Sequence, residues 1–203
     1  MPLTSSTYIP DVLCSYDLPG PTALAWLQHK GQVTVVDSKM AVSKLLPNSP
    51  CRRAHVAAFL LPRNCTACGL LAFWVWEGGP FPTRLEALCD QHPKSAPPHD
   101  ICLLQRQLGP HETLDIAGLS VTTPLRTAVD LVCLPRDIFD VRVGMGRFVM
   151  FLHHNKLTIN DCLERLRQNS RAVGYTTGRR RLEKLAARPE VSILLSSPRK
   201  DER

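Results

Sequence analysis

The apolar and polar residues of this chain follow two different periods. Apolar residues recur at helical spacing in three early segments, which cover 22–30, 52–61 and 66–77. Short apolar runs between turn-forming residues predict strands, and these runs lie at 85–89, 101–107, 113–117 and 119–121. The pattern therefore predicts an α+β protein, in which helices pack on a small and mostly antiparallel sheet.

The first fifty residues carry a weaker pattern than the rest of the chain. Residues 1–20 show no periodicity and predict a loose arm, whereas the helix at 22–30 precedes a strand at 32–36. A further helical turn is expected at 40–46. Because this stretch is short for a complete winged-helix module, we expect a partial winged-helix-like element here.

The C-terminal third is predicted to be helical. Asp137 begins a helix that runs to His154, and Thr158 with Asp161 resembles a capping box before the next helix. A last, basic helix is expected over 178–187. The predicted regions are an N-terminal part, an α/β domain with a helical C-terminal part, and a polar tail, at 1–50, 51–190 and 191–203.

The most specific stretch of the sequence runs from residue 120 to residue 132. Thr123 can cap a helix, and Pro124 has the preset φ that suits the first helical position. Arg126 and Asp130 stand four residues apart and are close enough to pair on the helix surface. One guanidinium and one carboxylate perform no reaction without a nucleophile or a metal, so we expect this pair to brace the helix against the sheet.

This stretch also carries a family resemblance. The pattern Thr-Pro-x-Arg-Thr-x-x-Asp, from Thr123 through Thr127 to Asp130, resembles the C-terminal domain of the AbiEi family, the antitoxin half of bacterial type IV toxin–antitoxin systems. The apolar segments 53–62 and 69–79 resemble the helix pair of the same family. The resemblance implies a DNA-binding transcriptional regulator that needs no cofactor. It also implies a possible nucleotidyltransferase-like toxin as partner and a possible homodimer.

Positive charge is concentrated near the C-terminus. The chain has a net charge of +7, and the segment 165–188 alone holds seven Arg and one Lys against one Glu. This segment is either a solvated helical face or a surface that binds nucleic-acid phosphates. The candidate DNA contacts are Arg165, Arg167, Arg171, Arg179, Arg180, Arg181 and Lys184.

Cysteine spacing raises the question of a metal site. Cys65 and Cys68, together with Cys89 and His92, have the spacing of four zinc ligands. The competing interpretation is that Cys65 and Cys68 open an apolar helix, where cysteine behaves as a small hydrophobic residue. We expect no metal, although Cys65 near a helix start is also a candidate redox thiol.

The sequence gives no sign of export or of catalysis. It lacks a secretory signal, and its longest apolar stretch, at 67–76, is too short to span a bilayer. We expect a cytoplasmic protein whose eight cysteines are reduced thiols. No nucleophile elbow, P-loop or dinucleotide fingerprint is present, so we expect a regulator that binds rather than an enzyme. The alternatives are a protein-interaction module without a nucleic-acid role and a zinc- or redox-responsive regulator.

Overall fold

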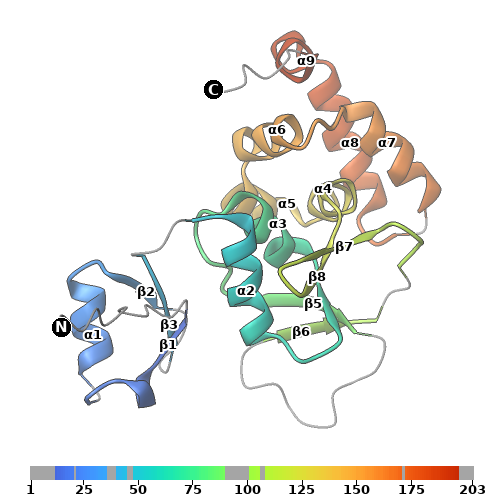
Figure 1. The fold of residues 1–203 in the computed structure, drawn as a ribbon. Coiled ribbons are helices and arrows are strands. Elements are labelled where there is room, and N and C mark those ends of the chain that lie inside the picture. Colours follow the sequence, from blue (N-terminus) through green and yellow to red (C-terminus); the bar gives the residue numbers. More distant parts are fainter. Residues whose placement is uncertain are drawn as a thin grey trace, which may run out of the picture.

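The computed structural model confirms the predicted α+β class. A small N-terminal sheet with one covering helix lies beside a larger body, in which helices cover a second sheet (Figure 1). The structure describes residues 12–20, 22–35, 40–44, 48–89, 101–105, 108–170 and 172–196.

The N-terminal unit is a three-stranded antiparallel sheet in the order β1-β3-β2. Its elements are β1 Val12–Cys14, the 3₁₀ turn η1 Ser15–Asp17, α1 Ala23–His29, β2 Val33–Val35 and β3 Met40–Ser43. The helical turn predicted at 40–46 is wrong over β3, because Val42 pairs with Val12 on one side and with Thr34 on the other. The partial winged-helix-like element stays a prediction, since the described part of this unit holds one α-helix and three strands.

The larger sheet is mixed, in the order β6-β5-β4-β8-β7. Its strands are β4 Cys65–Ala67, β5 Leu85–Cys89, β6 Ile101–Leu104, β7 Thr113–Ile116 and β8 Leu119–Thr122. The pairs β4–β5 and β7–β8 are antiparallel, whereas β4–β8 and β5–β6 are parallel. The sheet is therefore less antiparallel than the sequence predicts, because strand order depends on long-range contacts that local periodicity does not show.

The helix pair α2 and α3 covers this sheet. Helix α2 spans Pro50–Leu60 and begins two residues before the predicted segment 52–61, whereas α3 spans Gly69–Glu77 and the residues before it form β4. Glu86 of β5 accepts a hydrogen bond from the Leu70 backbone N–H at 2.8 Å, which fixes where α3 begins. Gly69 has a φ of +53°, and a Cβ there would collide with the Glu86 carboxylate. The predicted helix at 66–77 is thus shorter at its N-terminal end.

Seven helical elements follow the sheet within the described residues. They are α4 Pro124–Val132, α5 Arg136–Ile138, the π-helical turn η2 Phe139–Val143, α6 Met145–His154, α7 Ile159–Gln168, α8 Tyr175–Ala186 and α9 Pro189–Ser196. The single helix predicted from Asp137 to His154 is interrupted at Gly144, whose φ is +72°. The capping box of Thr158 and Asp161 is confirmed.

Helix α9 corrects the prediction of a polar tail from residue 191 onward. Pro189 follows the end of α8 and begins a new helix, since proline suits the first helical turn. Val191 of α9 is buried in the helical core. The rest of the predicted tail, 197–203, lies outside the described residues.

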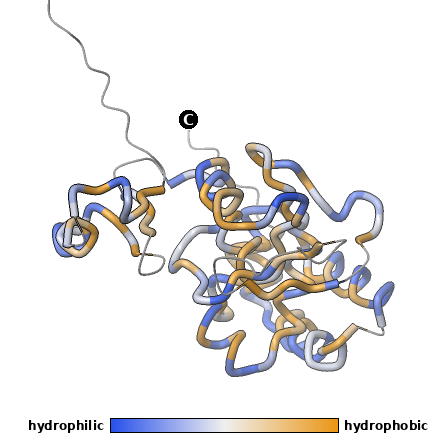
Figure 2. Tube along the Cα trace, turned by 90° about the horizontal axis from the view of Figure 1, so that it is seen from below, coloured by the Kyte–Doolittle hydropathy of each residue, from blue (hydrophilic) through white to orange (hydrophobic). Residues whose placement is uncertain are grey.

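Two main apolar clusters hold the larger body together. One lies around α2, α3 and the strands, and the other joins α3 to the helices from α4 to α9. Phe73 of α3 meets Phe151 of α6 edge to face, with ring centroids 5.3 Å apart. Figure 2 shows the apolar stretches running through the middle of the body. None of the helices in the described part of the chain combines the length and the apolar character needed to cross a bilayer.

Candidate nucleic-acid interface

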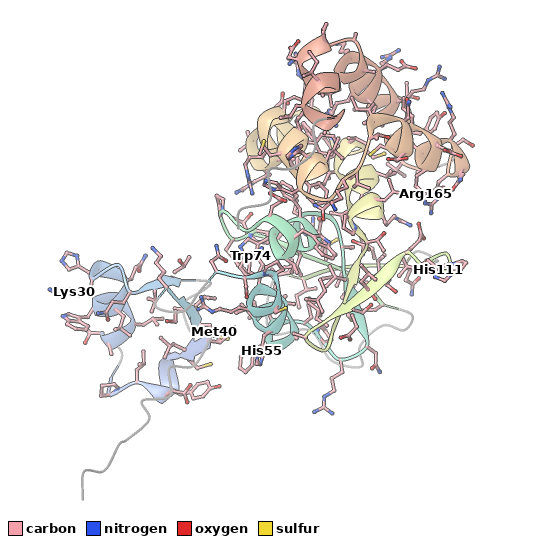
Figure 3. The ribbon with its side chains drawn as sticks, turned by 45° about the horizontal axis from the view of Figure 1, so that its top comes forward. Lys30, Met40, His55, Trp74, His111 and Arg165 are labelled. Carbon is pink, nitrogen blue, oxygen red and sulfur yellow. A yellow bond between two sulfur atoms is a disulfide. The ribbon has the colours of Figure 1, made fainter. Side chains whose placement is uncertain are left out.

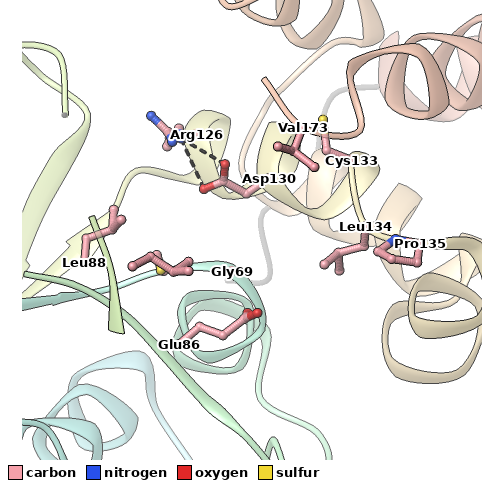
Figure 4. Close-up of a pocket in the computed structure, with 11 residues that line it drawn as sticks. Gly69, Glu86, Leu88, Arg126, Asp130, Cys133, Leu134, Pro135 and Val173 are labelled. Carbon is pink, nitrogen blue, oxygen red and sulfur yellow. Dashed lines mark hydrogen bonds and ion pairs between the residues drawn. The ribbon is translucent and has the colours of Figure 1, made fainter. Parts of the chain in front are cut away.

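The residues of the Thr123–Asp130 motif lie at the start of α4, as the sequence predicts. The Thr123 hydroxyl accepts a hydrogen bond from the Arg126 backbone N–H at 3.3 Å, and Pro124 occupies the first helical turn. Arg126 Nε donates to both carboxylate oxygens of Asp130 at 3.1 Å (Figure 4). Thr127 joins the helix to β8, since its hydroxyl donates to the Thr122 carbonyl at 3.1 Å. The motif therefore fixes α4 to the sheet.

Glu112 completes this arrangement, and the sequence analysis missed it. Arg126 Nη1 donates to Glu112 Oε2 at 2.9 Å, and Arg165 of α7 donates to the other carboxylate oxygen. Glu112 and Arg126 are only 6% and 5% exposed. Glu112 lies in the turn before β7, where no capping or periodic pattern marks it. The charge network of Glu112, Arg126, Asp130 and Arg165 thus ties that turn to α4 and α7.

The network is charged at neutral pH. Burial raises the pKa of Glu112, but hydrogen bonds from Arg165, the Gly109 backbone and Arg126 outweigh it, so its pKa lies below 4.5. Burial lowers the pKa of Arg126, and the charges of Asp130 and Glu112 reverse that effect, so its pKa is raised. Because the pKa of Glu112 is lower in the folded than in the unfolded protein, ionised Glu112 stabilises the fold. This contribution is fully present above pH 4.5 and is lost as the pH falls through the pKa of the folded state.

A cavity of about 160 Å³ lies beside Arg126 and Asp130 (Figure 4). Cys68, Cys133 and Glu86 also line it. Both carboxylates that line the cavity form structural hydrogen bonds. Asp130 accepts from Arg126, and Glu86 accepts from the backbone at the start of α3. Among the residues that the structure describes, no three His, Cys, Asp or Glu side chains converge as metal ligands do. We conclude from these contacts that the Arg126–Asp130 pair stabilises the position of α4.

Arg181, one of the predicted DNA contacts, points into the protein. Its Nη1 donates to the Val132 carbonyl, and to the Leu134 carbonyl at 3.1 Å, so it caps the C-terminal end of α4. Its guanidinium lies 4.0 Å from the centre of the Phe139 ring. Burial lowers the pKa of Arg181, and the charge of Asp140 opposes that shift. Arg181 is 9% exposed, which removes it from the set of phosphate contacts.

Two other predicted contacts already have acidic partners. Arg165 is held by Glu112, and Arg179 Nε donates to Glu183 at 2.7 Å on the surface of α8. A phosphate at either position has to compete with a carboxylate. Arg171 lies outside the described residues.

Arg167, Arg180 and Lys184 are exposed, and within the described part of the chain none of the three forms an ion pair. Arg180 and Lys184 stand one turn apart on α8, so they share a face. The opposite face buries Leu182 and Leu185 against the helical core. The structure therefore presents Arg180 and Lys184 outward from a helix whose inner side is fixed. We call this pair the α8 basic face.

The cysteines differ from the prediction of eight reduced thiols. Cys65 and Cys89 form a disulfide between β4 and β5. The two residues face each other directly, with a Cα–Cα distance of 4.6 Å, which is the spacing of a non-hydrogen-bonded antiparallel pair. Residues 24 apart in sequence become neighbours only when the strands pair. Of the other predicted zinc ligands, Cys68 is buried before α3, and His92 lies outside the described residues.

This arrangement leads to a thiol count that differs from the sequence prediction. Unfolded protein without reductant should show six titratable thiols, because Cys65 and Cys89 are bonded and the six remaining cysteines are free. Reduced protein should show eight. Elemental analysis should find no stoichiometric zinc, which stays a prediction from the sequence. One zinc per chain that disappears in Cys68→Ser would overturn the disulfide assignment, and so would eight thiols before reduction.

No known protein family has a sequence model that matches the chain, and no curated protein matches it.

Proposed function

We propose that this chain is an AbiEi-like regulator of the antitoxin type, which acts by binding DNA and not by catalysis. The observation that supports the proposal is the α8 basic face. Arg180 and Lys184 are exposed on a helix whose inner side is held by Leu182, Leu185 and the Arg181 cap. A rigid helix that presents cations outward can hold DNA phosphates in a fixed geometry.

The geometry of the α8 basic face suits a phosphate backbone. Arg180 and Lys184 are about 6 Å apart along the helix axis, since each residue rises about 1.5 Å. Arg188, just beyond α8, and Arg167, on the adjacent α7, are further exposed cations in this part of the protein. Phosphate contacts give affinity without choosing a sequence, so these residues account for general DNA affinity only.

DNA binding should therefore be strongly salt-dependent. We expect the full chain to bind a fluorescent duplex from its own promoter region. The logarithm of the affinity should fall with the logarithm of salt concentration, with a slope of roughly −2 to −3, because each neutralised phosphate adds about 0.9. Fluorescence anisotropy across a salt series measures this slope. Binding weaker than about 10⁻⁴ M at physiological salt would favour the protein-interaction module instead.

The Cys65–Cys89 disulfide favours a second candidate function, a redox-responsive regulator. Disulfides in cytosolic proteins are rare and are usually transient, catalytic or redox-sensing. A cytoplasmic location, which belongs to this proposal, therefore implies that the bond between β4 and β5 opens and closes. The same anisotropy series, run with and without dithiothreitol, tests this function. A cognate toxin and a homodimer are further proposals that rest on the family resemblance alone.

A further inference from the structure

Residues of the turn that follows α3 line two hollows. One has a volume of about 240 Å³ and is bordered by β2, β3 and α2, and the other, of about 120 Å³, is bordered by α3 and η2. Trp74 and Phe81 line both hollows, and their rings meet edge to face at 4.8 Å. Figure 3 shows Trp74 where the larger body meets the N-terminal unit. We call the two hollows together the Trp74–Phe81 groove.

All the charged side chains that line this groove are cationic. Lys44 and Arg52 line the first hollow, and Arg142 and Arg147 line the second. Among the described residues, no Asp or Glu lines either hollow. Because Lys44, Arg142 and Arg147 bring positive charge to the described lining and no described carboxylate lines it, the groove attracts a negatively charged ligand.

Arg147 is held in place before any ligand binds. Its Nη2 donates to the Gly78 carbonyl at 2.9 Å and its Nη1 to the Arg142 carbonyl at 3.3 Å. Its guanidinium also lies 4.8 Å from the centre of the Phe73 ring. An arginine has five N–H donors, so these bonds leave others for a planar acceptor such as a carboxylate. A fixed guanidinium loses little entropy when a ligand binds.

The apolar part of the groove is recessed. Phe73 and Trp74 are buried, so they form a floor, whereas Phe81 is half-buried and Val141 is 79% exposed at the rim. Single-stranded nucleic acids stack their bases on exposed ring faces, which this floor does not offer. Hollows of 120 and 240 Å³ are smaller than typical small-ligand pockets and suit single side chains.

We propose that the Trp74–Phe81 groove is a docking site for an extended acidic segment of a partner protein. Apolar side chains of that segment enter the two hollows, and its carboxylates pair with Arg142, Arg147 and Lys44 at the rim. Successive side chains of an extended chain point to opposite sides and are about 3.3 Å apart. Its apolar side chains can therefore contact the floor while its acidic side chains contact the cations at the rim. This function is separate from DNA binding, because the groove shares no residue with the α8 basic face.

Fluorescence anisotropy with labelled decapeptides tests the proposal on the full chain. A peptide of alternating glutamate and leucine should bind. Peptides of alternating lysine and leucine, or of alternating glutamate and serine, should bind at least about tenfold more weakly, because they lack the charge or the apolar side chains. Arg142→Glu should weaken binding of the first peptide at least about tenfold, since Arg142 is exposed and its loss does not disturb the fold.

Arg84→Glu is the matched control, because Arg84 is an exposed arginine outside both hollows. It makes the same charge change and should leave peptide affinity within about twofold of the wild type. The proposal is overturned if the glutamate–leucine peptide does not bind, or if the two variants affect it equally. A ten-nucleotide oligothymidine is the second probe. If it binds more tightly than the peptide, and if Arg142→Glu abolishes that binding, the groove is a nucleic-acid site instead.

Discussion

Replacing Arg126 with methionine should lower the free energy of unfolding by about 3–5 kcal/mol. Arg126 is 5% exposed and forms ion pairs with both Glu112 and Asp130. Its removal takes a guanidinium away from two carboxylates near the core, while Arg165 stays on Glu112. The cost is the desolvation of charges that have lost a partner, rather than the loss of one hydrogen bond. Urea unfolding followed by circular dichroism measures the change.

A double variant separates this explanation from simple loss of packing. Arg126→Met combined with Glu112→Leu should recover part of the stability, since replacing both buried partners by apolar residues is often tolerated. Arg167→Met on the exposed side of α7 is the control and should stay within about 0.5 kcal/mol of the wild type. If Arg126→Met is as stable as that control, the charge network does not brace α4.

Replacing Arg181 with methionine should cost about 2–4 kcal/mol of stability. Methionine keeps much of the apolar stem but leaves the Val132 and Leu134 carbonyls without their donor, and it removes the contact with Phe139. Arg180→Met, on the adjacent position, should change stability by less than about 0.5 kcal/mol because Arg180 is exposed. Thermal unfolding of the two variants measures both effects. Equal stability would contradict the buried cap.

Helix starts could be predicted from the sequence because the residues that fix them are local. Thr123 and Pro124 begin α4, and Thr158 with Asp161 begins α7, as their patterns predict. The strands β3 and β4 were missed because their residues lie inside the apolar segments 40–46 and 66–77, which favour a helix, and their extended backbone depends on pairing with other strands.

The candidate sites were harder to predict, because charge counts do not say which way a side chain points. Arg181 belongs to a basic run, yet it caps α4, and Arg53 caps α3 in the same way by donating to the Val75 and Trp76 carbonyls at 2.9 Å. Glu112 and the Cys65–Cys89 bond depend on partners that are distant in sequence. Local patterns contain no signal for such contacts.

The most direct test of the proposed function compares two double variants that remove the same charge. Arg180→Ala with Lys184→Ala removes the α8 basic face, whereas Arg63→Ala with Arg84→Ala removes two exposed arginines before β4 and β5. Duplex DNA affinity is measured against salt for both variants and the wild type. The proposal predicts that the α8 variant flattens the salt slope by about two units while the control keeps the wild-type slope. Equal slopes in the two variants would contradict a DNA contact on α8.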